Sequence, residues 1–136
     1  MFRTFDHTAD LGLHIEARSL EELMAEAGRA LTSVLVGEVS SVQPRESRSY
    51  FVPGSEPELL LFDWLTELLY VFDTEQFVGS EFAVQRSAAG LEITARGEPI
   101  DPARHRLEHE VKAITYHHLS VAVSPEGYVA EVIVDI

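Results

Sequence analysis

Two aspartates and a histidine stand close together near the start of the chain, in the stretch FDHTAD at residues 5–10. Carboxylate oxygens are hard ligands of the kind that calcium and magnesium prefer. Asp and Thr are also common in turns, where their side chains bond nearby backbone N–H groups. No helix is predicted to begin after Asp10, so helix capping does not explain the group. The residues alone leave two interpretations open: a functional site, or a turn in which His7 is an ordinary core or loop histidine.

A second candidate lies at the far end of the chain, in the segment YVAEVIVDI. Alternate residues of a strand share a face, so Asp135 is predicted to point away from an apolar row at residues 130, 132, 134 and 136. The carboxylate that follows at Ile136 would lie beside the Asp135 carboxylate, and two such anions repel each other unless a cation lies between them. A frayed, solvated chain end is the alternative interpretation.

Lys112 is the third candidate, in the segment EVKAITY, which we predict to be a strand. A lysine between apolar neighbours can extend its ammonium group to solvent along its apolar stem. It can also neutralise nearby carboxylates. Both interpretations stay open at this point.

The remaining motifs argue against a self-contained enzyme. His105 and His109 are four residues apart, but without the H-E-x-x-H pattern, and the adjacent His117 and His118 would face opposite sides of a strand. The sequence contains no glycine-rich phosphate loop, no G-x-S-x-G motif and no cysteine.

Composition narrows the possible partners. The chain has 136 residues, which fits one domain spanning 1–136, and a net charge of −13. Nucleic-acid backbones attract Lys and Arg, so we expect no tight binding of RNA by this chain alone. A cation or a basic protein surface is the expected partner, although acidity can also serve solubility alone. No segment resembles a membrane span or a signal peptide, which predicts a cytoplasmic protein with no membrane association.

Two amphipathic helices are predicted to position these residues. The first spans residues 19–37, with Ser19 and Glu22 as a capping box and Gly37 as the stop. The second spans residues 55–75, with Ser55 and Glu58 as its capping box and Pro57 in the first turn. Its polar stripe is narrow, at Asp63, Glu67, Tyr70 and Asp73. The wide apolar remainder, including Trp64, favours deep burial over a flank reserved for a partner.

The other segments are predicted to be strands. Residues 11–17 alternate, residues 81–85 and 91–95 form a hairpin around AAG, and residues 110–124 and 128–136 form a long hairpin around Pro125 and Gly127. The predicted class is α+β: a two-layer fold in which a mostly antiparallel or mixed β-sheet carries two α-helices on one face.

Taken together, DHTADLGLHIEARSLEELMAEAGRAL, GEPIDPARH, EVKAITYHHLSV and the closing VIVDI resemble the archease family, in order from residue 6 to residue 136. The resemblance implies an accessory protein of the GTP-dependent RNA ligase of tRNA splicing and RNA repair, which joins 3′-phosphate and 5′-hydroxyl ends. The family promotes guanylylation of that ligase and its multiple turnover. The resemblance does not imply that this chain is the ligase.

The resemblance also implies site residues. The family's metal site corresponds to Asp10, Asp135 and the terminal carboxylate of Ile136, and ligase activation to Asp10, Lys112 and Asp135. His7 matches the histidine of the motif in a supporting role. The implied cofactor is a divalent metal ion, with calcium favoured and magnesium or manganese as alternatives. RNA would be contacted only through the ligase, and a homo-oligomer is possible.

Two other functions stay open. The chain could be a chaperone or modulator of a tRNA cytosine methyltransferase or another RNA-processing enzyme, acting through the apolar flank near Trp64 and tolerating loss of Asp10. It could also be a stand-alone metallohydrolase, in which two carboxylates and a lysine activate water on a metal.

Overall fold

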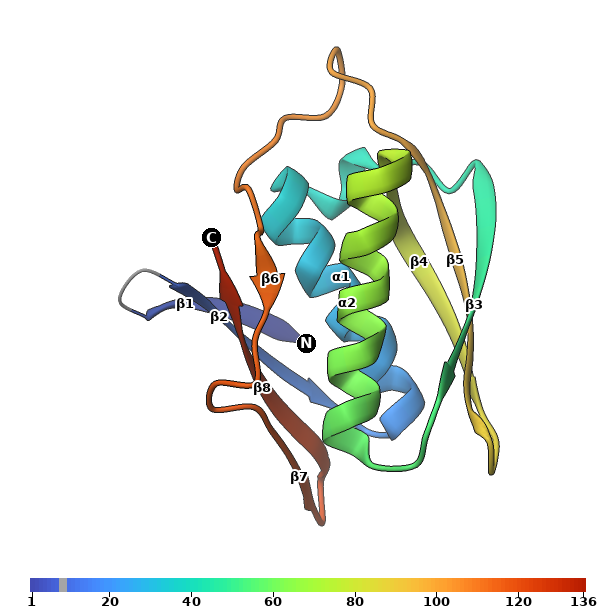
Figure 1. Cartoon of the computed structure of the whole chain (residues 1–136), viewed down its shortest axis with the longest axis vertical. Helices are drawn as coiled ribbons and strands as arrows, with labels where there is room; N and C mark the ends of the chain where they lie inside the picture. The colour runs from blue at the N-terminus through green and yellow to red at the C-terminus, as the bar shows by residue number, and fades with distance from the viewer. Residues whose placement is uncertain (8–9) are drawn as a thin grey trace.

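A computed structural model describes the backbone of residues 1–7 and 10–136 and the side chains of residues 1–5 and 10–136 (Figure 1). The elements run in the order β1 (Phe2–His7), β2 (Asp10–Ala17), α1 (Leu20–Val36), the 3₁₀ turn η1 (Val39–Ser41), β3 (Glu46–Pro53), α2 (Pro57–Glu75), β4 (Phe77–Arg86), β5 (Gly90–Pro99), β6 (Ala113–Ile114), β7 (Ser120–Ser124) and β8 (Gly127–Asp135). The α+β class predicted from the sequence is confirmed.

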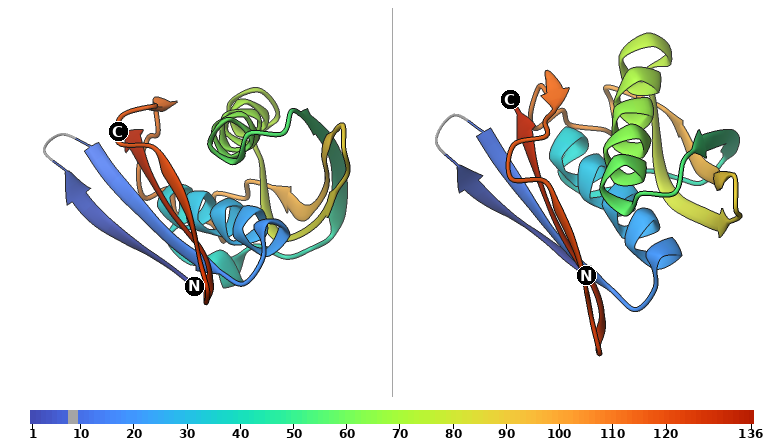
Figure 2. Two further views of the ribbon diagram at one scale, coloured as in Figure 1. Left: turned by 90° about the horizontal axis from the view of Figure 1, so that it is seen from below. Right: turned by 60° about the horizontal axis from the view of Figure 1, so that its bottom comes forward.

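The described strands form two antiparallel sheets, whereas the sequence predicted one sheet with both helices on one face. One sheet has the order β1-β2-β8-β6, with β7 also paired to β8, and the other has the order β3-β5-β4. Figure 2 shows the helices between the two sheets. A bulge in β4 between Gly79 and Glu81 helps to explain this arrangement. There, the Thr32 hydroxyl of α1 donates to the Gly79 carbonyl (2.8 Å) and the Arg29 guanidinium donates to the Ser80 carbonyl (2.9 Å), which ties α1 to the three-stranded sheet. Helix α1 also contacts β2 and β8 of the other sheet.

Helix α1 begins and ends as its sequence predicts. The backbone N–H of Glu22 donates to the Ser19 side-chain oxygen at 3.1 Å, which satisfies one of the free N–H groups of the first turn. Gly37 ends the helix with φ +79°, a conformation that costs glycine little. Leu23, Met24 and Leu31 are fully buried, so one face of the helix belongs to the core.

Helix α2 differs from its prediction at its start. Its N-cap is Glu56, without a side-chain hydrogen bond to the first turn, so the capping box of Ser55 and Glu58 was wrong. Pro57 takes the first helical position because its missing N–H needs no partner there, and this fixes the boundary. Trp64 is fully buried and donates its indole N–H to the Met24 carbonyl at 2.9 Å. The wide apolar face is therefore core, and Trp64 offers no surface to a partner.

The C-terminal half of the five-stranded sheet is less regular than predicted. β7 and β8 do form a hairpin, in which Ser124 pairs with Gly127 around the turn. The long strand predicted to precede that turn is broken, because β6 is short and His118 adopts a left-handed backbone (φ +54°). His117 and His118 lie in a turn with their rings 4.4 Å apart, so the argument from strand alternation does not apply to them. No helix in the described part of the chain is long and apolar enough to cross a membrane.

Candidate metal site

Asp10 and Asp135 lie directly opposite each other in the pairing of β2 with β8. Directly opposed residues of an antiparallel pair project to the same face, with their Cβ atoms about 5 Å apart. The next pair, Leu11 and Val134, is buried in the core, so alternation places the two aspartates on the face that points away from the helices. Both aspartates are only half-buried, and two acidic groups from opposite ends of the sequence therefore share one surface.

Lys112 reaches the same place through the backbone. Its N–H donates to the Asp135 carbonyl at 2.7 Å, and the following residue, Ala113, pairs with Asp135 in the register of β6 with β8. Lys112 lies just before β6 rather than inside a strand, which corrects its predicted position, and its side chain is exposed. Three segments that are far apart in sequence meet here, and Figure 1 shows the C-terminal end of β8 beside β6.

Ile136 and His7 complete the set predicted from the sequence. Ile136 follows Asp135, and its half-buried side chain packs on the core beside a hollow of about 540 Å³ that Phe2, Leu11 and Val34 also line. The backbone of His7 pairs with Asp10 in the register of β1 with β2, whereas its side chain lies outside the described residues. The structure thus brings Asp10, Lys112, Asp135 and Ile136 to one end of the sheet.

The donor set is consistent with a hard divalent cation. Among the side chains that the structure describes, no group of three or more His, Asp or Glu residues could hold a metal ion. Asp10 and Asp135 supply two carboxylates, so a third protein donor would be the Ile136 carboxylate. Oxygen donors of this kind suit calcium and magnesium.

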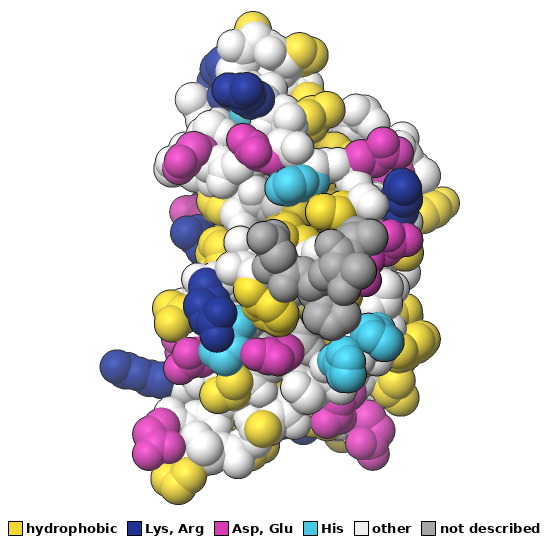
Figure 3. Space-filling model, turned by 90° about the vertical axis from the view of Figure 1, so that its left-hand side faces the viewer, with side chains coloured by type: hydrophobic (Ala, Val, Ile, Leu, Met, Phe, Trp, Pro, Cys, Tyr) yellow, Lys and Arg dark blue, Asp and Glu magenta, His cyan; other side chains and the backbone are white. Residues whose placement is uncertain are grey.

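The face that carries this sheet end is mixed in charge. Figure 3 shows acidic side chains, histidines and several lysines or arginines spread over it, with apolar side chains between them. The surface around this end of the sheet is therefore not uniformly acidic.

A second cluster of polar residues, around Glu98, was not predicted from the sequence. Glu98 is only 3% exposed, and its carboxylate accepts two hydrogen bonds from the Arg104 guanidinium and one from the Gln43 N–H (2.7 Å). Burial alone raises the pKa of Glu98, but the bonds from Arg104 and Gln43 outweigh burial and lower that pKa to about 2. The motif GEPIDPARH contains both Glu98 and Arg104. This short spacing between an acidic and a basic residue was the signal from which the ion pair could have been predicted.

His105 belongs to this cluster and not to a metal site. Its Nδ1 accepts the Asp101 N–H at 2.8 Å, so Nε2 carries the proton and donates to Glu98 (3.1 Å) and to the Ser41 carbonyl (3.2 Å). Both ring nitrogens are therefore used inside the protein. The cluster fastens the segment that leads from β5 toward Lys112.

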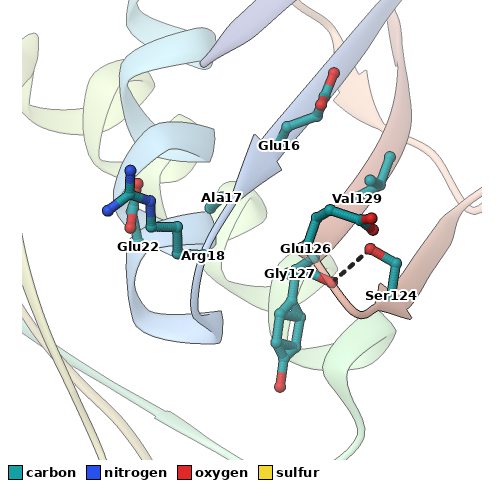
Figure 4. Close-up of a pocket in the computed structure, with 9 residues that line it drawn as sticks. Glu16, Ala17, Arg18, Glu22, Ser124, Glu126, Gly127 and Val129 are labelled. Carbon is teal, nitrogen blue, oxygen red and sulfur yellow. Dashed lines mark hydrogen bonds between the residues drawn. The ribbon is translucent and has the colours of Figure 1, made fainter.

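A separate hollow of about 250 Å³ lies at the other end of the β2–β8 pairing (Figure 4). Arg18 and Glu22 lie on one side of it and Glu126 on the other, and the Ser124 hydroxyl donates to the Gly127 carbonyl at 3.4 Å. Its charges are mixed and it is remote from Asp10 and Asp135, so it adds no donor to the candidate metal site.

Comparisons with known proteins agree with this structure. The Archease protein family (MTH1598/TM1083) matches residues 2–136. Protein archease of Pyrococcus abyssi is 37% identical over 137 residues, covering 97% of this chain and 96% of its own length.

Two solved structures share the fold. The solution structure of Methanobacterium thermoautotrophicum protein 1598 has a TM-score of 0.79 and 32% identity, covering 99% of this chain and 98% of its own. The crystal structure of an archease and possible chaperone, TM1083 from Thermotoga maritima, has a TM-score of 0.70 and 23% identity, covering 100% and 98%. The family match and the identity to these relatives show that this chain belongs to the archease family.

Proposed function

We propose that this chain is an accessory protein that activates a GTP-dependent RNA ligase joining 3′-phosphate and 5′-hydroxyl ends. It would promote guanylylation of the ligase and its multiple turnover in tRNA splicing and RNA repair. The observation that carries the proposal is the opposed pair Asp10 and Asp135, to which the backbone of Lys112 is hydrogen-bonded.

A divalent ion held by Asp10, Asp135 and the Ile136 carboxylate is part of the proposal. Calcium is favoured, with magnesium or manganese as alternatives. The ion would supply positive charge that offsets the repulsion between the carboxylates. The backbone of Lys112 is bonded to Asp135 and its side chain is exposed, so its ammonium would contact the ligase or GTP, while His7 would support the position of Asp10.

The net charge of −13 supports contact with RNA only through the ligase, because phosphates repel acidic surfaces. The protein would act in the cytoplasm, alone or as a homo-oligomer. A chaperone of a tRNA cytosine methyltransferase is the second candidate, but Trp64, near which its apolar surface was expected, is buried.

Ligation by the cognate ligase under multiple-turnover conditions tests the proposal. Wild-type protein should raise both ligase guanylylation and the number of turnovers. Asp10→Ala and Asp135→Ala should lower that stimulation at least about tenfold, since an ion held by few donors depends on each of them. Lys112→Ala should also impair it, with a smaller effect on ion binding. Glu126→Ala is the matched control, an exposed acid at the far end of β8.

Normal stimulation by folded Asp135→Ala, together with normal stimulation by a protein extended beyond Ile136, would rule out the proposed metal site. Equal stimulation by every variant alongside tight RNA binding by the isolated protein would rule out the accessory role.

A further inference from the structure

One face of α2 stays open to solvent between the two sheets (Figures 1 and 2). Leu59 is 50% exposed and Tyr70 is 62% exposed, with Asp63 and Glu67 exposed between them. Residues three and four apart lie on the same side of a helix, so these four side chains form one continuous strip. Two acidic groups thus lie in the middle of the strip, with an apolar side chain at each end.

A pair of aromatic side chains extends this strip on one flank, and a hollow borders it on the other. On one flank, Tyr116 stacks on Phe62 of α2 with ring centroids 3.9 Å apart, yet stays 61% exposed. On the other flank, Asp63 and Glu67 line a hollow of about 280 Å³ against β3. Three of the seven most exposed large hydrophobic side chains in the described chain, Leu59, Tyr70 and Tyr116, thus lie on α2 or against it. Single exposed hydrophobics are ordinary, but such a concentration marks an interaction surface.

The charge of this region selects the kind of partner. Residues 49–85 contain no Lys or Arg and seven acidic residues, at positions 56, 58, 63, 67, 73, 75 and 81. An RNA or an anionic lipid surface would be repelled. A second copy of this chain placing the same face against itself would oppose like charges, since a two-fold interface uses one patch twice. A segment that is both cationic and apolar complements the surface.

We propose that the α2 face, formed by Leu59, Asp63, Glu67, Tyr70 and Tyr116, docks a basic amphipathic segment of a protein partner. The identification of that partner with the RNA ligase rests on the function proposed above. Tyr116 follows β6, whose Ala113 pairs with Asp135, so the α2 face adjoins the candidate metal site through a few residues. Docking at the α2 face sets the affinity of this chain for the ligase, and the metal site sets the maximal stimulation of the ligase.

The first experiment needs no ligase. A synthetic amphipathic peptide of leucine, arginine and lysine is titrated into the protein and amide chemical shifts are followed by NMR. The double variant Asp63→Lys/Glu67→Lys should bind about tenfold more weakly than wild type, because it places cations where the peptide brings cations. The control Glu38→Lys/Glu126→Lys makes the same change in net charge at exposed sites elsewhere and should bind within about twofold of wild type.

The second experiment uses the cognate ligase. The α2-face double variant should need about tenfold more protein for half-maximal stimulation while reaching the same maximum, whereas Asp135→Ala should lower the maximum itself. Equal behaviour of the α2-face and control variants with both peptide and ligase would overturn the docking surface. Self-association of the wild type that the α2-face variant abolishes would overturn it in favour of a second copy.

The two proposals can fail separately. If wild-type protein does not stimulate the ligase but the α2-face variant selectively loses the peptide, the function proposed above fails and the docking surface stands. Melting curves of both double variants verify that all four substitutions leave the fold intact.

Discussion

Carboxylates occupy two opposite environments in this protein. Glu98 is buried, and Arg104, Gln43 and His105 all donate hydrogen bonds to it. Asp10 and Asp135 lie face to face at the end of a sheet, half-buried, and the Asp135 carboxylate forms no ion pair with any residue that the structure describes. In the first environment one carboxylate is surrounded by donors, and in the second two carboxylates are placed on the same face of a sheet.

From this comparison we predict that Glu98 serves the structure and that Asp10 and Asp135 serve the proposed function. A buried charge whose hydrogen bonds are all made inside the protein contributes to stability and offers nothing to a ligand. Opposed like charges at a surface cost stability, and an arrangement of that kind is commonly retained for binding or catalysis. The predictions below test that division, in order of decreasing expected effect.

The largest expected effect is the loss of folding stability when Glu98 is replaced. Glu98→Ala should lower the free energy of unfolding by about 3 kcal/mol, because it leaves the Arg104 charge and the His105 N–H without their partner. Asp135→Ala should change it by less than about 1 kcal/mol and can raise it in metal-free buffer by relieving repulsion. Denaturant unfolding of both variants is the measurement. An equal loss in the two variants would erase the proposed difference between the two regions.

Acid should affect the Glu98 cluster in a defined pH range. The folded-state pKa of Glu98 is lowered to about 2 from an ordinary value of 4.5, so its stabilisation is full well above pH 4.5 and is lost as the pH falls toward 2. That contribution is roughly 3 kcal/mol. Unfolding free energies measured across this range should fall less steeply for Glu98→Gln than for wild type. Parallel curves would show that another group dominates acid unfolding.

Stabilisation by calcium should depend on Asp10 and Asp135 and not on Glu98. At a concentration ten times its dissociation constant, calcium should stabilise the wild type by about 1.4 kcal/mol, because only the folded state presents the site. Asp10→Ala, Asp135→Ala and a protein extended beyond Ile136 should lose this gain, whereas Glu98→Gln should keep it. Thermal melts with calcium and with a chelator provide the measurement. Retention of the full gain by Asp135→Ala would place the ion elsewhere.

The smallest expected effect concerns the two hydrogen bonds by which the Arg104 guanidinium holds the Glu98 carboxylate. Arg104→Lys keeps the charge but loses the fork that bonds both carboxylate oxygens, so it should cost about 1 kcal/mol. The same substitution should leave calcium binding unchanged. A loss as large as that of Glu98→Ala would mean that charge alone does not compensate Glu98.

Local patterns predicted much of the fold. Ser19 and Gly37 mark the ends of α1, and the apolar row of the last strand, including Val132 and Val134, is buried as alternation requires. The division into two sheets could not be predicted in this way, because the choice of partner strand depends on contacts between distant segments. The start of α2 at Pro57 shows how one residue can override a capping pattern.

The candidate site, too, could be predicted only in part from the sequence. Asp10, Lys112 and Asp135 could be selected from sequence by their chemistry and by family resemblance, but their meeting point depends on the register of β8 with β2 and β6. Glu98 escaped prediction because alternation along β5 places it with the exposed Glu92, Thr94 and Arg96, whereas the segment that follows the strand folds over it.

The position of β8 also has a consequence for how the molecule folds. β8 pairs with β2, β6 and β7, and its register joins residue 135 to residue 10. Pairings between distant segments form slowly, because the entropy of closing the intervening loop is lost before the contacts are gained. Helix α1 and the β4–β5 hairpin rely on local contacts and can form first. Asp10 and Asp135 therefore meet late in folding, so a partner that requires both of them distinguishes finished molecules from unfinished ones.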